Sequence, residues 1–381
     1  MRNMGLRLVI GVCLLLGVCT ASPVLGQPQP VPKMSERPLD RASYVTLAKQ
    51  WQEYIERHGE TADALVNLGM ALRYSREMEA AEAAGKRAVE VEPENPRALN
   101  FYATILSLKD VRSTEAIRLL EKCRAVAPDY GDALISLAAA HLRGARLASA
   151  RDVFKTIFDR RIISRPLQDF AYNMLIGLPK GAVLVTNGDN DTFPPMALQA
   201  GMEFRTDVVV VNRHLLNVPE YLDSLLSEHP FLRPGGGWKT APGPNASRSL
   251  IERWIAGGSM PLFFALTVSM EDLGLNPETT VEGLNRRALG KGLTPEEAAR
   301  LILERYRLDS ATDWDFAWDL VPSVSGMMAN YVGSMTTAAQ REGVPADLKC
   351  RLLDRAEAIA EFHNLSSLAH VKALLKKCET R

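Results

Sequence analysis

The sequence predicts an α plus α/β fold in three parts: an N-terminal helical array, a small mixed α/β domain with a parallel core, and a C-terminal helical segment. Between residues 62 and 160 an apolar pattern recurs about every 34 residues, the length of a two-helix repeat. After Pro179 the apolar residues gather in short runs separated by a stretch of helical length, which is typical of a βαβ unit. From Thr294 onward they return at helical spacing, so residues 291–381 are predicted to be helical.

Composition places the chain among ordinary globular proteins. Its 381 residues are 46% hydrophobic and 24% charged, as in folded domains. The 45 basic and 45 acidic side chains balance, and no run of lysine and arginine stands out. Because binding to nucleic acid or to an anionic membrane depends on concentrated positive charge, neither partner is predicted.

The N-terminus has the features of a cleavable signal peptide, which we predict over residues 1–26. Arg2 and Arg7 precede the apolar stretch Leu8–Cys19, which is too short to span a bilayer. Small residues and then a proline-rich linker, residues 27–38, follow it. The chain is therefore expected to be exported, periplasmic or secreted, with no transmembrane segment once the signal is removed.

Three questions about the exported chain stay open at this point. The signal would be cleaved after Ala21 or after Gly26, and the sequence does not distinguish these positions. Cys19 could carry a lipid anchor only if it remained in the mature chain. The residue before it, Val18, is larger than the small residue that lipoprotein signals use there. Cys350 and Cys378 fall on two predicted helices, and an oxidising compartment would allow them to pair.

The helical array is predicted over residues 39–165. Small residues recur where paired helices must approach closely, and a proline recurs where the second helix of a pair ends. The recurring positions are Gly69, Ala81, Pro93, Ala103, Ala116, Pro128, Ala138 and Ala150. Over about 62–160 they resemble the tetratricopeptide repeat, which implies a groove that binds an extended peptide or a helix of a protein partner. The alternative, that the array only packs against the next domain, stays open.

The α/β domain is predicted over residues 166–290. Two short apolar runs, Ala182–Thr186 and Asp207–Asn212, have strand character, and the stretch Met196–Phe204 between them has helical length. A strand, a helix and a second strand in this order predict two parallel strands. Pro261–Val268 is a third candidate strand.

One block of this domain is distinctive. The run LVTNGDNDTFPPMALQAGMEFRTDVVVVNRHLLNVPEYLDSL resembles the soluble extracytoplasmic region of protein O-mannosyltransferase-like membrane glycosyltransferases. PLFFALTV, Glu282-Gly283-Leu284 and Asn330-Tyr331 fit the same family in the same order, so the resemblance covers about 175–345. The chain departs from the family pattern at Glu220 and at Asn285-Arg286.

The resemblance implies an accessory role. In that family the sugar-transfer chemistry belongs to a transmembrane part, and no run of 18 apolar residues follows the signal here. The resemblance therefore implies a module that handles an acceptor or assists glycosylation, without implying the transferase reaction itself.

Polar side chains gather directly after the first predicted strand. The candidate ligand or metal residues are Asn187, Asp189, Asn190, Asp191 and Thr192, with Asn212 and Tyr221 as neighbouring candidates. The carboxyl end of such a strand is where open α/β sheets place ligands, and these oxygens are ones that Ca²⁺ or Mg²⁺ prefers. The alternative is structural, because Asp191 or Thr192 would equally cap the helix that follows.

No established catalytic motif accompanies this loop, so the catalytic set is predicted to be empty. The leading hypothesis is a non-enzymatic exported scaffold that binds a protein or glycoconjugate partner, accessory to extracytoplasmic glycosylation. The alternative is a metal-dependent carbohydrate-active enzyme that uses Asp189 and Asp191. The partner, the glycan and the oligomeric state are not predicted.

Overall fold

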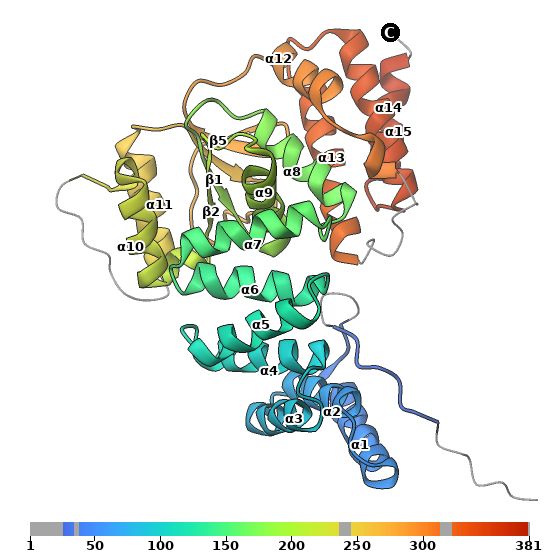
Figure 1. Ribbon diagram of the computed structural model, residues 1–381. Coiled ribbons are helices and arrows are strands. Elements are labelled where there is room, and N and C mark those ends of the chain that lie inside the picture. Colours follow the sequence, from blue (N-terminus) through green and yellow to red (C-terminus); the bar gives the residue numbers. More distant parts are fainter. Residues whose placement is uncertain (1–25, 34–37, 236–244, 313–321, 380–381) are drawn as a thin grey trace, which may run out of the picture.

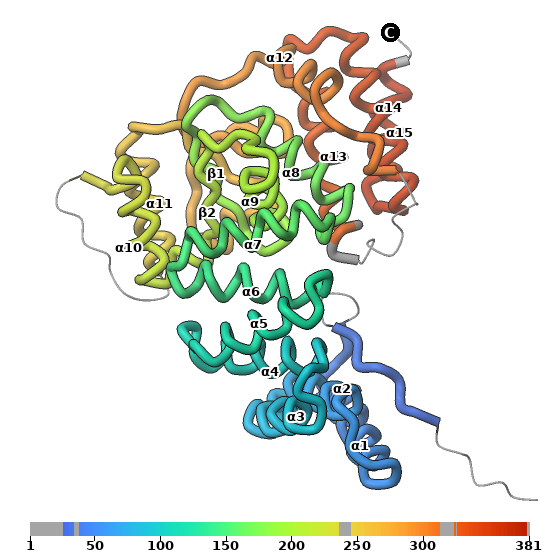
Figure 2. The backbone as a smooth tube through the Cα atoms, in the orientation of Figure 1, coloured from blue at the N-terminus to red at the C-terminus, as the bar shows by residue number. Residues whose placement is uncertain are grey.

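The computed structural model describes residues 26–33, 38–235, 245–312 and 322–379. The chain runs from the N-terminal helices at one end of the molecule to the C-terminal helices at the other (Figure 1, Figure 2). The predicted signal peptide lies outside the described residues except for Gly26. Within the described ranges, no helix combines the length and the apolar character needed to cross a membrane.

Helices α1 to α7 form the array, and each of α1 to α6 packs on the next, while α8 follows them at the start of the α/β domain (Figure 1). Their bounds are α1 Arg41–His58, α2 Ala62–Tyr74, α3 Met78–Val91, α4 Pro96–Lys109, α5 Thr114–Val126, α6 Gly131–Arg143, α7 Leu147–Asp159 and α8 Arg165–Ile176. Helices α2, α4 and α6 begin at residues 62, 96 and 131, which matches the repeat length expected from the sequence. The array is thus a stack of helix pairs, while its membership of the tetratricopeptide family stays a prediction.

Local chemistry explains where these helices begin and how closely they pack. Thr61 caps α2 by accepting a hydrogen bond from the Ala64 amide, and Asn95 caps α4 just before Pro96. A Cβ atom at Gly69 would overlap the ring of Phe101, so only glycine permits this approach of α2 and α4. The predicted packing positions Gly69, Ala81, Ala103, Ala116, Ala138 and Ala150 are buried, and Pro93 and Pro128 lie in exposed turns.

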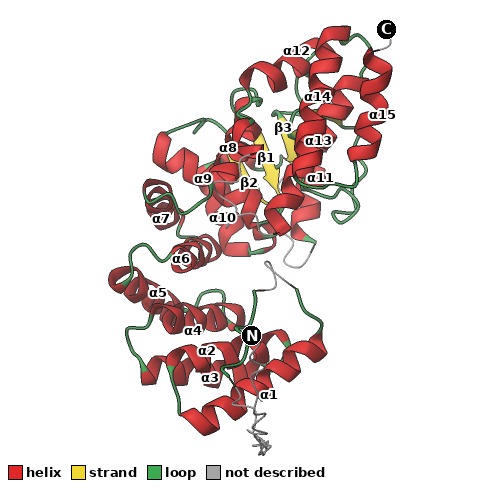
Figure 3. Ribbon diagram, turned by 90° about the vertical axis from the view of Figure 1, so that its right-hand side faces the viewer, coloured by secondary structure: helices red, strands yellow, loops and turns green. Residues whose placement is uncertain are grey.

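The α/β domain contains a sheet with strand order β2-β1-β3-β5-β4. The strands are β1 Val183–Thr186, β2 Val209–Asn212, β3 Leu262–Ala265, β4 Thr280–Glu282 and β5 Asn285–Leu289. β1 pairs in parallel with β2 and with β3, which confirms the predicted parallel core, while β5 is antiparallel to β3 and β4. Figure 3 shows the strands enclosed by helices, with the array extending away from them.

The helix between β1 and β2 differs from the expected one. Helix α9 spans Asp189–Met202 and therefore begins inside the polar turn, before the apolar stretch expected from Met196 and a few residues before the cap considered at Asp191 or Thr192. Two adjacent prolines, Pro194 and Pro195, remove N–H donors from its second turn, so the sequence pattern conceals this early start. The start depends instead on the cap that Asp191 supplies, which is described below.

The β4–β5 hairpin was not predicted. Its strands are joined through Gly283, whose φ of +61° lies in the left-handed region that favours glycine. Arg286 and Arg287 occupy the middle of β5, and two adjacent charged residues conceal the alternation that normally reveals a strand. Between β2 and β3 lie the helical elements η1 Leu215–Asn217, α10 Pro219–Glu228, η2 Pro230–Leu232 and α11 Ala246–Gly257.

The C-terminal segment is helical, as predicted. Its elements are α12 Pro295–Arg300, η3 Leu301–Arg305, η4 Asp309–Thr312, α13 Pro322–Gln340, α14 Ala346–Phe362 and α15 Leu368–Glu379. Thr294 and Glu297 form a reciprocal cap at the start of α12. A disulfide joins Cys350 on α14 to Cys378 on α15, with their Cα atoms 5.7 Å apart, which answers the question that the sequence left open.

Two apolar cores lie in the described chain. One lies among α1 to α4, and the larger one continues from α4 through the sheet to α15. The ring centres of Phe154 on α7 and Phe193 on α9 are 5.4 Å apart where the array meets the sheet domain. The last repeats are therefore packed directly against the α/β domain, and no linker separates them.

Candidate functional site

The polar residues singled out from the sequence, Asn187–Thr192, are called the Asp loop here. The loop follows β1, which lies between its parallel neighbours β2 and β3. The chain leaves β1 toward β2 and later returns on the other side as β3. Such a reversal, at the carboxyl ends of parallel strands, is where open α/β sheets most often bind ligands. The position of the loop thus suits a binding site, and its bonding determines which groups are available.

Asp191 is fully engaged within the protein. Its Oδ2 accepts a hydrogen bond from the Asn187 amide and its Oδ1 accepts one from the Gly188 amide, both at 2.7 Å. The Thr267 hydroxyl, which lies just beyond β3, also donates to Oδ2. The side chain is only 2% exposed, and burial raises the pKa of its carboxyl while these hydrogen bonds oppose that rise. Asp191 therefore caps α9 and ties the end of β1 to the loop after β3.

Thr192 and Asn212 are also structural. The hydroxyl oxygens of Thr192 and Thr186 are 2.7 Å apart, and Asn212 donates from Nδ2 to Thr192 Oγ1 at 3.0 Å. The Oδ1 of Asn212 accepts from the His214 amide at 2.9 Å. All of these side chains except that of His214 are buried. This network joins β1, α9 and β2 and leaves no side chain of its members facing solvent.

Asn187 and Asp189 are the members of the loop that face outward. Asn187 Oδ1 accepts a hydrogen bond from Arg213 Nε at 2.6 Å. Asp189 keeps contact with solvent, yet protein surrounds its carboxyl closely enough that partial loss of hydration raises its pKa. The charge of Arg143, at the end of α6, opposes that rise, and Asp191 adds to it. Asn190 is half-buried beside them.

Three neighbours of the loop were not predicted, namely Arg143, Arg213 and His214. Burial lowers the pKa of His214, and the charge of Arg213 lowers it further. Burial also lowers the pKa of Arg143, and Asp189 opposes this effect. Arg143 comes from the array, so no local pattern in the sequence indicates its place beside the loop. The result is a mixed-charge surface and not a concentration of acids: the described residues contain no group of three or more His, Cys, Asp or Glu that would hold a metal ion.

Tyr221 lies apart from this surface. It is 1% exposed on α10 and lines a mostly apolar cavity of about 180 Å³ between the array and the sheet domain. Phe154 and Val209 line the same cavity, and the residues of the Asp loop do not. The structure therefore brings Asn212 to the loop and separates Tyr221 from it.

A second arrangement lies in the array, where residues 26–33, called the N-terminal segment, run along its helices. Three residues of the segment, spaced two apart, make polar contacts with the described helices. Gln29 O accepts from Trp51 Nε1 at 3.1 Å, Val31 N donates to Asn67 Oδ1 at 2.9 Å, and Lys33 Nζ contacts both carboxylate oxygens of Asp132 at 2.8 and 2.6 Å. We call Trp51, Asn67 and Asp132, on α1, α2 and α6, the segment-binding face.

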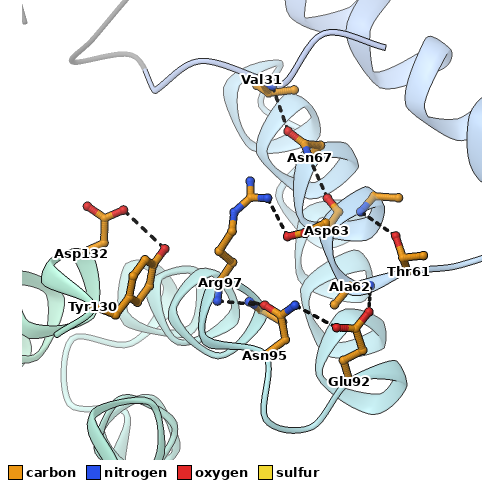
Figure 4. Close-up of polar contacts among 12 residues, drawn as sticks. Val31, Thr61, Ala62, Asp63, Asn67, Glu92, Asn95, Arg97, Tyr130 and Asp132 are labelled. Atoms are coloured by element: carbon orange, nitrogen blue, oxygen red, sulfur yellow. Dashed lines mark hydrogen bonds and ion pairs between the residues drawn. The ribbon is translucent and has the colours of Figure 1, made fainter. Parts of the chain in front are cut away.

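Asn67 makes the middle one of these contacts, and Figure 4 shows it between Val31 and Asp63. Its Nδ2 donates to Asp63 O in its own helix at 2.8 Å, which turns Oδ1 toward the Val31 amide. Asn67 is 2% exposed and Val31 is 5% exposed, so their hydrogen bond is shielded from water. A buried amide acceptor positioned in this way requires a donor, and here the backbone of the N-terminal segment supplies it.

Two further contacts lie around the face, one between α2 and α4 and one at the start of α6 (Figure 4). Arg97 on α4 donates to Asp63 on α2 at 2.6 Å. The Tyr130 hydroxyl, just before α6, lies 3.5 Å from Asp132 Oδ2, and burial together with the charge of Asp132 raises the pKa of Tyr130 to about 12. Asp63 and Asp132 are thus each held by a contact within the array, whereas the sequence indicated only a linker over residues 27–38.

The comparisons with known proteins concern the Asp loop and not the segment-binding face. Residues 167–229 match the family model described as TMEM260-associated domain 2. The matched residues run from α8 through β1, α9 and β2 to the end of α10, which is well under half of the chain. This match links the segment to O-mannosyltransferase-like proteins. A search of curated proteins found no match.

Proposed function

We propose that this chain is a non-enzymatic exported protein that binds an extended segment of a partner, a protein or glycoprotein, on the segment-binding face. One observation carries the proposal: the face holds an extended chain through a backbone amide. Backbone contacts of this kind give affinity, and the flanking side-chain contacts give selectivity. The repeat length of the array, which the sequence likened to tetratricopeptide repeats, supports the same role.

An accessory role in extracytoplasmic glycosylation is the second element of the proposal. Its support is the match of residues 167–229 to a TMEM260-associated domain, together with the wider resemblance to O-mannosyltransferase-like proteins. In this role the array would hold the polypeptide to be modified, or a component of the machinery, while the α/β domain provides the link to glycosylation. The enclosed core between the two parts would keep them in fixed relation.

The geometry gives less support to a metal-dependent enzyme. Both carboxylate oxygens of Asp191 already accept backbone N–H groups, and the carboxylate is buried. Asp189 has Arg143 and His214 in its electrostatic environment, which would repel a cation when they are charged. No specific contact among the described residues favours catalysis.

The test is selection of peptides on the full chain. A random library of extended peptides is panned against the chain carrying Val31→Asp, which places a charge at a buried apolar position and releases the N-terminal segment. We expect enriched peptides whose affinity, measured by fluorescence polarisation, falls at least about tenfold with Asn67→Leu added. The same affinity should be unchanged by Asp189→Asn. A library without enrichment, or binding that depends on Asp189 and not on Asn67, would contradict the proposed function.

A further inference from the structure

The N-terminal segment contacts the array as a bound peptide would. Its contacts fall on alternate residues, Gln29, Val31 and Lys33, and prolines occupy the positions between them. Prolines at 28, 30 and 32 hold the backbone extended and leave the amide of Val31 free to donate. The segment is thus pre-organised for the contact it makes.

The contacts are specific but few. One apolar side chain, Val31, is buried, and Gln29 is exposed apart from its carbonyl bond to Trp51. The ion pair of Lys33 with Asp132 is about half open to solvent, with side-chain exposures of 42% and 41%. Exposed pairs of this kind bind weakly, so the segment is the kind of element that detaches without unfolding the array.

We propose that the N-terminal segment is a built-in competitor, which occupies the segment-binding face until a partner with the same chemistry displaces it. This inference rests on the proposed function and specifies the partner. The partner segment is extended, carries a small apolar residue at the position of Val31, and carries lysine or arginine two residues later. Prolines flank the apolar residue.

Each requirement follows from a named contact. Asn67 Oδ1 needs an N–H donor, so the residue at the central position is not itself proline. The apolar cluster of α1 to α4 around Val31 excludes a charged side chain there, because burial of an unpaired charge is costly. Asp132 favours a cation two residues further along the chain.

Attachment to the chain makes the segment an effective competitor. Residues 34–40 connect it to α1, and a tether of this length gives an effective concentration on the order of millimolar. The face is then open for only a fraction of the time. The apparent affinity for a free peptide equals its affinity for the open face multiplied by that fraction. A weak internal contact is therefore sufficient to block weak partners.

The experiment uses a fluorescein-labelled peptide of residues 27–33 and the full chain. We expect it to bind the Val31→Asp chain at least about tenfold more tightly than the wild type. The matched control is Val111→Asp, a substitution at an exposed valine in the turn after α4, which should bind like the wild type. Equal affinity for the wild type and the Val31→Asp chain would show that the segment does not occupy the face.

A charge exchange tests the position of the bound peptide and adds no further buried substitution to the Val31→Asp chain. Asp132→Lys, on the exposed first turn of α6, added to the Val31→Asp chain should weaken the peptide and favour a version with Glu in place of Lys33. Failure of this exchange would overturn the assignment of the face. If the library peptides bind through Asn67 but the peptide of residues 27–33 does not, the competitor inference fails and the proposed function stands. If neither binds, both fail.

Discussion

The Asp loop and the segment-binding face use the same chemistry and differ in where the bonding partner comes from. In the loop, Asp191 accepts hydrogen bonds from Asn187, Gly188 and Thr267, all fixed parts of the sheet domain. In the face, Asn67 accepts its hydrogen bond from Val31, in a segment that neither begins nor ends in a helix or strand. The first acceptor is satisfied permanently, and the second is satisfied by a group that another chain could replace.

Polar composition alone is therefore a poor guide to the position of a ligand-binding site. The Asp loop attracts attention because it concentrates carboxylates and amides after a strand, yet its most buried carboxylate serves as a helix cap. The face has no such concentration in the sequence, since its residues lie on α1, α2 and α6. A binding function depends on acceptors whose partners are exchangeable, which only the folded structure reveals.

The largest effect is expected from Asp191→Ala, which tests whether the Asp loop is held together by this carboxylate. Removal of this carboxylate leaves two backbone amides and the Thr267 hydroxyl without their buried acceptor, so we expect the free energy of unfolding to fall by about 3 kcal/mol. Urea unfolding followed by circular dichroism measures the change. Asp189→Ala, in the exposed neighbour, is the control and should cost about 0.5 kcal/mol or less. Equal losses in the two variants would contradict the structural role of Asp191.

Asn67→Ala should have a smaller global effect and a large local one. The variant loses one hydrogen bond to the segment and one to Asp63 O, which we expect to lower the free energy of unfolding by about 1 kcal/mol. Amide exchange at Val31 should accelerate strongly, because its acceptor is gone. Asn100→Ala, on α4 and outside the segment contacts, should leave exchange at Val31 unchanged. Unchanged exchange in Asn67→Ala would show that the segment is held by other contacts.

The smallest expected effect is a pH dependence confined to the Asp loop. Burial raises the pKa of Asp191 above its ordinary value, so ionisation of this carboxyl costs more free energy in the folded state than in the unfolded one. This cost is fully present above the folded pKa and disappears as pH falls through it toward the unfolded value. The stability of the wild type relative to Asp191→Asn should therefore increase between pH 7 and pH 4. A difference that stays constant or shrinks as pH falls would argue against a raised pKa.

Much of the fold could be predicted because its signals are local. The repeat length placed the starts of α2, α4 and α6, and strand, helix, strand order predicted the parallel pairing of β1 and β2. The start of α9 was misplaced because two prolines interrupt its pattern, while the cap that stabilises it comes from Asp191. The β4–β5 hairpin was missed because Arg286 and Arg287 hide its alternation.

The candidate site was less predictable because its contacts join distant parts of the chain. Position in the sequence placed Asp189 and Asp191 at the end of β1 and left open whether Asp191 would bind a ligand or cap the helix that follows, a choice that its hydrogen bonds from Asn187 and Gly188 decide for the cap. The contact between Val31 and Asn67 spans 36 residues, and Lys33 and Asp132 are 99 residues apart. The proline-rich composition of residues 27–38 indicated only a linker and could not specify the surface that receives the segment.

Helix α6 gives the two regions a mechanical connection. Its first turn carries Asp132, which holds Lys33, and its last residue is Arg143, whose charge acts on Asp189. A helix of 13 residues is a stiff rod about 20 Å long. If one end were tilted by about 5° around the other, it would move by about 1.7 Å, more than half the length of a hydrogen bond. In these terms α6 has the geometry of a lever, with Asp132 at one end and Arg143, beside the Asp loop, at the other.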